Sequence, residues 1–334
     1  MRRLFILVVS LLAVVSFAAV AEQAVLIDFS ELIADWPPDN PNNNEATIFD
    51  YSEQAGTGFS EEERLMMRSS LAIENWEVLL APSSRYVRLQ AESFARQAFV
   101  REGANRYAGE GVMGVRVNFP MGRFNSWALI RPPFEIPAYE DVSVIEDDGT
   151  ITTPQDEEGR GRKFDGYGVV KNVGTLRSLS MNVHGLNFPH GISVVLQDEN
   201  FREQEIFLGY LDFDGWRTLE WRNPNYITDV RMRDLRPAPL YPNLAPMRKL
   251  IGIRIYRDAE VTGGDFISYI KDINVTYDRA VLELERDIDD EAVWGILQQR
   301  EAARRRAELE RVGNVQILRF LEQQRMFDED NGDI

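Results

Sequence analysis

The sequence contains no cysteine, only two histidines and only four lysines among its 334 residues. Without cysteine there is no disulfide framework, no cysteine-ligated zinc site and no cysteine nucleophile. Acidic side chains outnumber basic ones by 54 to 37, which gives a formal net charge of -17 at pH 7. Such a charge repels phosphate, so a nucleic-acid partner is not expected. The sequence also lacks a phosphate-binding loop, a dinucleotide fingerprint and a Gly-x-Ser-x-Gly motif.

The N-terminus has the pattern of a cleavable export signal. Met1-Arg2-Arg3 is positively charged, residues 4–20 are mostly apolar, and Ala19-Val20-Ala21 fits the small-x-small rule for cleavage before Glu22. We therefore predict a signal peptide over residues 1–21 and an exported chain. A membrane-anchoring helix is the alternative, which the shortness of the apolar run disfavours. No later stretch is apolar enough to predict a membrane span.

Short alternating segments between turn residues dominate residues 22–280. Leu179, Met181 and Val183 show the two-residue period of a strand with one buried face. Turns such as Asp214-Gly215 separate these segments at short intervals. The pattern predicts a mainly β domain, a jelly-roll-like β-sandwich. The expected strands are residues 25–29, 76–80, 86–100, 112–119, 126–130, 176–183, 191–196, 205–210, 217–221, 249–256 and 266–277.

Two segments depart from this strand pattern. Ser60, followed by three glutamates, resembles a capping box and predicts a short helix up to Ser70. Residues 140–158 contain eight acidic side chains and no basic one, together with Gly149 and Pro154. We interpret this segment as an acidic loop or hairpin tip, and a cation site is the alternative.

The composition changes after Asp278. Residues 287–327 contain no proline and are rich in helix formers, so we predict a helical arm over 281–327 with a break or kink at Gly313-Asn314. Residues 328–334 are expected to be a disordered tail. The middle of the arm is polar nearly all round, which is typical of a helix that projects from a body or bridges to a partner. The candidate interface residues of this arm are Trp294, Leu297, Ile317, Leu318, Phe320 and Leu321.

Few residues suggest metal binding or catalysis. His184 and His190 would need carboxylate ligands to hold a metal ion, and polar side chains in turns are far commoner than ligands. Asp212 and Asp214 could face a hydrated cation, but a tight turn is the favoured interpretation. None of the 54 acidic residues stands out as the catalytic pair of a glycoside hydrolase. We therefore predict no enzyme activity, no metal site and no cofactor.

Four aromatic residues lie in or next to predicted strands and turns, namely Trp216, Trp221, Tyr226 and Tyr241. Exposed aromatic rings can stack on sugar rings while neighbouring polar groups bind the hydroxyls. Core packing is the favoured interpretation, because Trp221 has the same strand parity as Leu219. A protein interface and a glycan-contact site are the two alternatives.

Six strings in the predicted β domain carry a family resemblance. They are GVRVNFP at 114–120, WALIRPPF at 127–134, RSLSMNVHG at 177–185, FPHG at 188–191, LGYLDFDGW at 208–216 and IGIRIY at 251–256. As a set they resemble the spirochaete flagellar filament outer-layer (sheath) protein family, FlaA, over roughly residues 20–280. The helical arm matches this family less distinctly.

The resemblance implies a structural subunit of the periplasm that coats the core flagellin of a periplasmic flagellum and contributes to filament shape and motility. It implies a body similar to the jelly rolls of carbohydrate-binding modules and no catalytic residues. The implied partners are the core flagellin and other copies of the chain or a paralogous sheath protein. The strong negative charge fits this role, because mutual repulsion keeps such a subunit soluble before assembly. A periplasmic carbohydrate-binding module is the alternative function.

Overall fold

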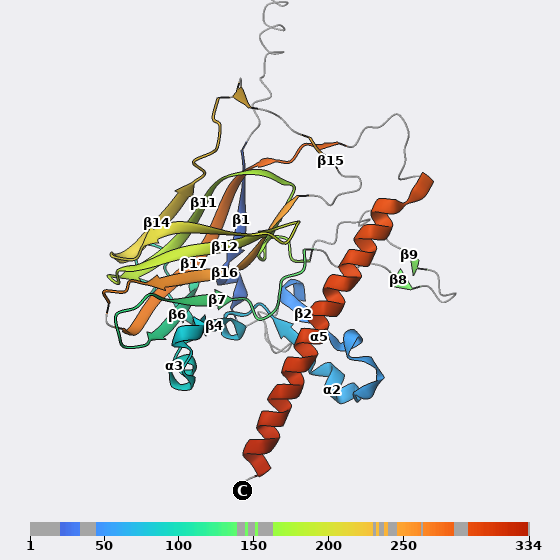
Figure 1. Ribbon diagram of the computed structural model, residues 1–334, viewed down its shortest axis with the longest axis horizontal. Helices are drawn as coiled ribbons and strands as arrows, with labels where there is room; N and C mark the ends of the chain where they lie inside the picture. Colours follow the sequence, from blue (N-terminus) through green and yellow to red (C-terminus); the bar gives the residue numbers. More distant parts are fainter. Residues whose placement is uncertain are drawn as a thin grey trace, which may run out of the picture.

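The computed structural model describes residues 21–33, 45–138, 144–145, 151–152, 163–229, 232–233, 237–239, 246–261, 263–283 and 293–332. Its main part is a sandwich of two six-stranded antiparallel sheets, beside which a long helix lies (Figure 1). Residues 1–20 of the predicted signal peptide, Tyr241 and most of the acidic segment 140–158 lie outside the described residues. Within that segment, β8 (Val144–Ile145) pairs antiparallel with β9 (Ile151–Thr152).

The first sheet is built around the long strand β17 (Gly264–Arg279). One edge of β17 pairs with β11, and the other edge pairs with β6 over its first half and with β1 over its second half. The outer strands β14 and β5 pair with β11 and β6. The strands around β17 are β14 (Asp214–Arg222), β11 (Val173–Leu186), β6 (Gly111–Phe119), β1 (Glu22–Asp28) and β5 (Phe94–Phe99).

The second sheet has the same plan around β16 (Met247–Arg257). One edge of β16 pairs with β12, and the other edge pairs with β7 and β10 in succession. The outer strands are β13, next to β12, and β4, next to β7. The strands around β16 are β13 (Glu203–Tyr210), β12 (His190–Asp198), β7 (Ser126–Arg131), β10 (Val169–Lys171) and β4 (Glu77–Leu80).

The hydrophobic core fills the space between the two sheets. Leu179, Met181 and Val183 are fully buried on β11, as their alternation predicts, and Ile253 and Ile255 are fully buried on β16. Burying each such side chain stabilises the fold by about 1.5–3 kcal/mol before the entropy of ordering is counted. The predicted β-sandwich with a C-terminal helix is confirmed.

The helix predicted after Ser60 is confirmed, but it is shorter than expected. α2 (Glu61–Leu65) begins with a capping box, in which Ser60 N–H donates to Glu63 Oε2 over 2.7 Å. The helix ends at Leu65 because β3 (Arg68–Ser70) pairs with β2 (Ile48–Asp50).

Residues 87–91 form α3 (Val87–Ala91) rather than the predicted strand. The side chain of Gln90 explains the difference, because it accepts from Leu80 N–H and donates to the Val78 carbonyl at β4. These bonds hold a helical turn against the end of β4.

Several short elements connect the sheets. The 3₁₀ helices are η1 (Phe29–Leu32), η2 (Glu45–Thr47), η3 (Ser52–Gly58), η4 (Ile73–Asn75) and η5 (Pro82–Ser84). In addition, β15 (Ala238–Pro239) pairs parallel with β18 (Leu282–Glu283).

α5 (Ile296–Gly332) is one continuous helix of 37 residues, and a helix of this length spans about 55 Å. The predicted break at Gly313-Asn314 is therefore wrong. Gly313 instead permits close packing, since a Cβ atom there would lie 2.6 Å from Gln54 Cγ on η3. Residues 328–332 continue the helix where the sequence predicts a disordered tail. Among the described residues, no helix is long and apolar enough to cross a membrane.

Candidate interaction surfaces

α5 packs one face against the body through a short apolar stripe. Val312 is only 3% exposed, and Leu309, Ile317 and Phe320 are partly buried against the hydrophobic core. Their spacing of three to five residues places them along one side of the helix. The arm is therefore docked on its own sandwich over its middle turns.

Buried ion pairs reinforce this contact. Lys249 on β16 is fully buried, and its Nζ lies 2.8 Å from Glu135 Oε1 and 3.0 Å from Glu308 Oε1 on α5. Arg311 pairs with the other oxygen of Glu135. Burial of Glu135 opposes ionisation, but Lys249 and Arg311 outweigh it and lower the pKa of this carboxyl below its ordinary value. One network of charges thus connects β16, the segment after β7 and α5.

Further polar contacts continue toward the C-terminus of α5. Gln316 Nε2 donates to the Pro133 carbonyl over 3.0 Å, and Arg319 donates to the same carbonyl and pairs with Glu77 at 3.0 Å. Beside these contacts, a cleft of about 420 Å³ remains between α5 and the ends of β7, β12 and β16. The docked face therefore combines an apolar stripe with polar contacts and is incompletely filled, unlike the sandwich core.

The predicted arm residues separate into two groups. Ile317 and Phe320 pack against the core of the same chain, and Leu297 is half-buried. Trp294, Leu318 and Leu321 are 65%, 61% and 41% exposed. Only the second group is therefore exposed enough to contact another subunit.

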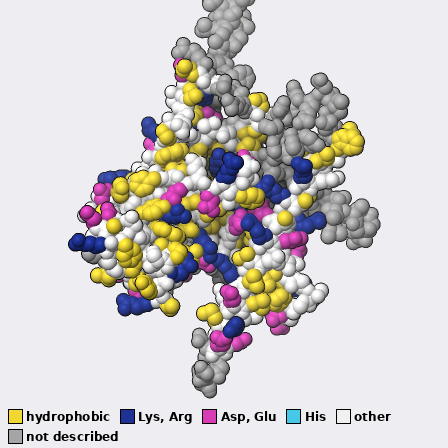
Figure 2. Space-filling view, viewed as in Figure 1, with side chains coloured by type: hydrophobic (Ala, Val, Ile, Leu, Met, Phe, Trp, Pro, Cys, Tyr) yellow, Lys and Arg dark blue, Asp and Glu magenta, His cyan; other side chains and the backbone are white. Residues whose placement is uncertain are grey.

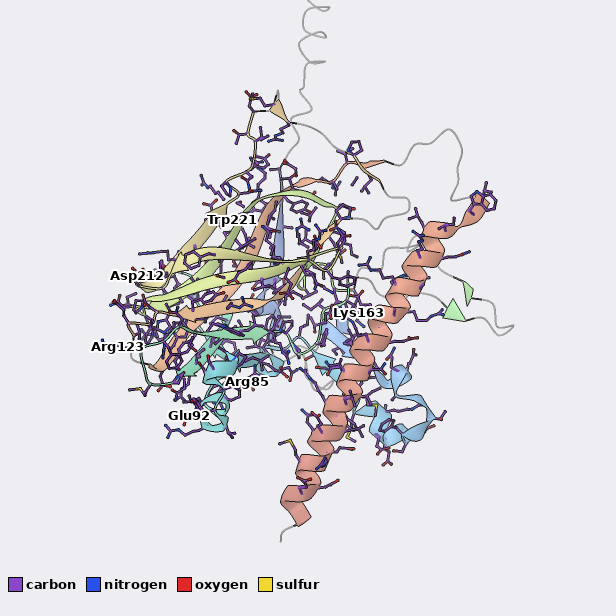
Figure 3. The ribbon with its side chains drawn as sticks, in the orientation of Figure 1. Arg85, Glu92, Arg123, Lys163, Asp212 and Trp221 are labelled. Carbon is purple, nitrogen blue, oxygen red and sulfur yellow. The ribbon has the colours of Figure 1, made fainter. Side chains whose placement is uncertain are left out.

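The predicted aromatic set is not brought together. Trp216 lies edge-to-face with Tyr107 and His184 at ring separations of 4.9 and 5.3 Å. Trp221, five residues along β14 (Figure 3), instead packs against the core. Tyr226 donates to Asp278 over 2.9 Å and contacts the guanidinium groups of Arg177 and Arg233. These three residues occupy separate environments rather than one platform.

A different aromatic set lies on the outer face of the second sheet, and sequence reasoning missed it. Tyr210, Gly191, Tyr256 and Trp127 are successive partners in one row across β13, β12, β16 and β7. The ring of Phe207, 5.3 Å from that of Tyr210, lies against Gly191, where a Cβ atom would be 2.8 Å from it. Phe207 and Tyr210 are 46% and 57% exposed. Hydrophobic side chains gather over these strands in Figure 2.

Polar groups are interleaved with these rings. Arg254 Nη1 pairs with Glu205 at 2.6 Å, and the Cζ of the same guanidinium lies 5.0 Å from the ring centroid of Trp127. Tyr256 Oη donates to the other oxygen of Glu205 over 2.5 Å. Burial raises the pKa of Tyr256, and the Glu205 carboxylate adds to this effect. The phenol therefore stays protonated and able to donate at neutral pH.

At one end of the sandwich, a buried cation organises the loop between β6 and β7. Arg257 is 2% exposed and donates to the carbonyls of Pro120, Gly122 and Phe124. Burial lowers the pKa of the neighbouring His190 to about 4, and the charge of Arg257 acts in the same direction. His190 is therefore neutral at pH 7, and it stacks on Phe266 at 4.9 Å.

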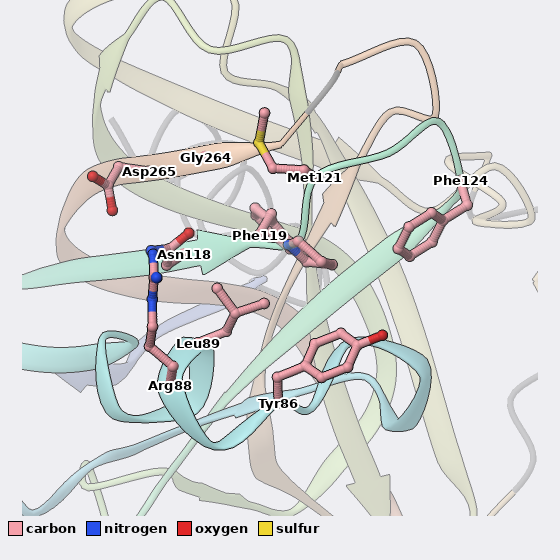
Figure 4. A pocket seen from close by; sticks show the side chains of 10 residues that line it. Tyr86, Arg88, Leu89, Asn118, Phe119, Met121, Phe124, Gly264 and Asp265 are labelled. Carbon is pink, nitrogen blue, oxygen red and sulfur yellow. The ribbon is translucent and has the colours of Figure 1, made fainter.

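The loop held by Arg257 borders a pocket of about 440 Å³. Tyr86, Leu89, Met121 and Phe124 surround it in Figure 4. Asp212 and Asp214 are exposed at the β13–β14 turn. Within the described part of the chain, no group of three or more His, Asp or Glu residues is placed to hold a metal ion.

The described residues thus form a β-sandwich with a docked helix and partly apolar exposed surfaces. A family model described as "Flagellar filament outer layer protein Flaa" matches residues 40–286. The chain belongs to this family of flagellar filament outer layer proteins.

Individual relatives agree over nearly the full length. The chain is 47% identical to a "Flagellar filament outer layer protein" of Spirochaeta aurantia, covering 98% of this chain and 94% of that protein. It is 45% identical to the protein of the same name from Treponema pallidum (strain Nichols), covering 93% and 91%. The solved structure of TmCBM61 with β-1,4-galactotriose has 11% identity and a TM-score of 0.27, covering 62% of this chain and 90% of that one. A similarity at this level supports no inference about ligands.

Proposed function

We propose that the chain is a structural subunit of the outer layer of a periplasmic flagellar filament. Membership of the outer layer family over most of the chain carries this proposal. The structure is compatible with this proposal, because a coat subunit needs a stable body and several surfaces for simultaneous contacts. The sandwich supplies the body, and α5, α3 and the outer face of the second sheet supply the surfaces.

The proposed partners are the core flagellin and other copies of the chain or a paralogous sheath protein. In this role the protein acts by binding and not by catalysis. Its proposed location is the periplasm, reached by means of the export signal over residues 1–21. N-terminal sequencing of the chain from isolated filaments should begin at Glu22, and a chain that still begins at Met1 would contradict cleavage.

The decisive test of the coat function is deletion of the gene. Periplasmic filaments isolated from the deletion strain should be thinner or differently curved than wild-type filaments when imaged by electron microscopy. Re-expression of the chain should restore the wild-type form. Unchanged diameter and curvature in the deletion strain would overturn the proposal.

A carbohydrate-binding module is the second candidate function, and the outer face of the second sheet favours it. Phe207 and Tyr210 offer exposed rings, while Arg254, which lies over the ring of Trp127, and Glu205 offer groups that bind hydroxyls. Stacking of a sugar ring on exposed aromatics buries the apolar face of the sugar.

Calorimetry with cell-envelope glycans tests this candidate. Phe207→Ala should abolish binding, whereas Trp216→Ala, on the other sheet, should leave it unchanged. Absence of binding to every envelope glycan by the folded protein would eliminate this candidate.

A further inference from the structure

Two surface patches of opposite charge each combine apolar and charged side chains. The first, called the basic patch, consists of Tyr86, Val87, Arg88, Met121, Arg123 and Phe124. It joins α3 to the loop held by Arg257. Val87, Met121 and Tyr86 are 90%, 75% and 62% exposed, which is unusual for large apolar side chains. Figure 2 shows hydrophobic side chains next to Lys and Arg in the region of α3.

The arginines of the basic patch are available for a partner. Arg88 is 82% exposed, and its pair with Glu92 at 3.3 Å is an exposed helical pair worth about 0.3–0.5 kcal/mol. Arg123 is exposed and makes no ion pair within the described residues. Asp265 at the rim is already paired with Arg116 at 2.9 Å. Figure 3 shows Arg123 and Glu92 at the same end of the sandwich as α3.

The second patch, called the acidic patch, consists of Glu61, Glu62, Glu63, Phe320, Phe327 and Asp328. It lies where α2 meets the C-terminal third of α5. A hollow of about 510 Å³ lies there, and two aromatic rings, two carboxylates and two amides line it, namely Phe320, Phe327, Glu63, Asp328, Gln323 and Gln324. Leu65 and Met66, at the end of α2, are 66% and 56% exposed. Figure 2 shows hydrophobic side chains beside Asp and Glu in this region.

The two patches are complementary to each other. One presents protruding apolar side chains flanked by arginines, and the other presents a hollow in which two aromatic rings lie among carboxylates and amides. In a chain with a net charge of -17, a cluster of arginines is the natural counterpart of the acidic surface of another copy. We propose that the basic patch of one copy binds the acidic patch of a second copy, with the Tyr86–Val87 corner entering the hollow between α2 and α5.

This contact would be the surface through which copies of the chain join in the proposed coat. Self-association through the two patches does not require the coat function, but its biological role rests on that function. The charges are exposed, so the interaction should weaken as salt is raised from low to physiological concentration. The apolar component should persist, because burial of Val87 and Tyr86 does not depend on ionic strength.

Charge reversal on each patch tests the contact. The protein is produced with residues 1–21 in place so that the host exports it, and its association is measured by sedimentation velocity. Arg88→Glu/Arg123→Glu and Glu62→Lys/Asp328→Lys should each weaken self-association at least about tenfold. The fourfold variant, which keeps the wild-type net charge, should recover most of the loss.

Matched controls exclude an effect of net charge alone. Arg202→Glu/Arg306→Glu makes the same charge change at exposed positions outside both patches and should leave association unchanged. A fourfold variant no better than either pair of reversals would overturn the proposal, and so would a wild-type chain that stays monomeric at every salt concentration.

A second readout separates this inference from the coat function. In co-sedimentation with isolated filaments, a wild-type chain that binds filaments but never self-associates would overturn the patch contact and leave the coat function standing. Patch variants that bind filaments as isolated subunits, without forming a continuous layer, would support both. A chain that self-associates but does not bind filaments would support the patch contact and overturn the coat function.

Discussion

Lys249 holds the arm to the body, and its replacement by methionine should release α5. The ammonium group is fully buried between Glu135 and Glu308, whose side chains are 28% and 11% exposed. Removing one partner of a buried pair costs about 3–5 kcal/mol, because the remaining charge stays desolvated. Arg311 still pairs with Glu135 in the variant, so the lower end of this range, about 3 kcal/mol, is expected.

Urea denaturation and amide hydrogen exchange measure this effect. Lys249→Met should lower the unfolding free energy and speed exchange along α5 more than in the β-sheets. Adding Glu308→Gln should recover more than half of the loss, because the uncompensated carboxylate is then removed. Arg325→Met, which breaks an exposed pair with Glu329 on the same helix, is the control and should cost no more than about 0.5 kcal/mol. Strictly additive effects of Lys249→Met and Glu308→Gln would refute the reasoning.

Three other predictions concern pH and packing. The pKa of His190 is lowered from 6.5 to about 4. The free energy of unfolding should therefore be highest above pH 6.5 and fall by up to about 3 kcal/mol as the pH drops toward 4. In His190→Phe, the urea midpoint should lose this pH dependence between pH 6.5 and 5. The pKa of Glu135 is lowered from its ordinary value of 4.5. The carboxylate therefore stabilises the docking of α5 above pH 4.5, and this stabilisation is lost as the pH falls through the folded-state pKa. Amide hydrogen exchange along α5 should quicken in that pH range, and an exchange rate that does not change with pH would contradict this. Gly313→Ala should destabilise docking because its Cβ would lie 2.6 Å from Gln54 Cγ, whereas the exposed Asn314→Ala should stabilise the helix by a few tenths of a kcal/mol, both read from thermal unfolding.

The strands could be predicted from the sequence because each has one face in the core. The two-residue alternation of β11 and β17 fixes which side chains are buried whatever their partners are. The helical turn of α3 could not be predicted in this way. It depends on hydrogen bonds from Gln90 to the end of β4, a tertiary contact that has no local signature.

The outer-face aromatics show a second limit of sequence reasoning. Phe207 and Tyr210 are three residues apart, so strict alternation predicts opposite faces of the sheet. The register shifts at this point of β13, where Gly209 has a φ of +147°, and both rings then lie on the same face. Such a bulge is favoured by glycine, but no sequence rule distinguishes this glycine from one at a turn.

The arm illustrates the limit for polar interfaces. Its middle turns are nearly without apolar periodicity, which typically indicates a helix that projects into solvent. Lys249 and Glu308 are 59 residues apart, and their pairing becomes visible only when β16 and α5 are placed side by side. That the apolar residues of the arm form an interface with another subunit stays a prediction, and two of them, Ile317 and Phe320, pack against the sandwich of the same chain.

The symmetry of assembly depends on how the two patches pair between copies. Two copies related by a two-fold axis would use both patches of each copy, so the assembly would end as a dimer. Without that axis, each contact uses the basic patch of one copy and the acidic patch of the next. One patch of each kind then stays free at the ends, and further copies can add. A layer that covers a long filament needs the repeating form. Sedimentation should therefore show a broad series of sizes that grows with protein concentration, and Arg88→Glu/Arg123→Glu mixed with the wild type should cap the series and shorten it. A single species of two copies at all concentrations would exclude the repeating arrangement even if both patches are in contact.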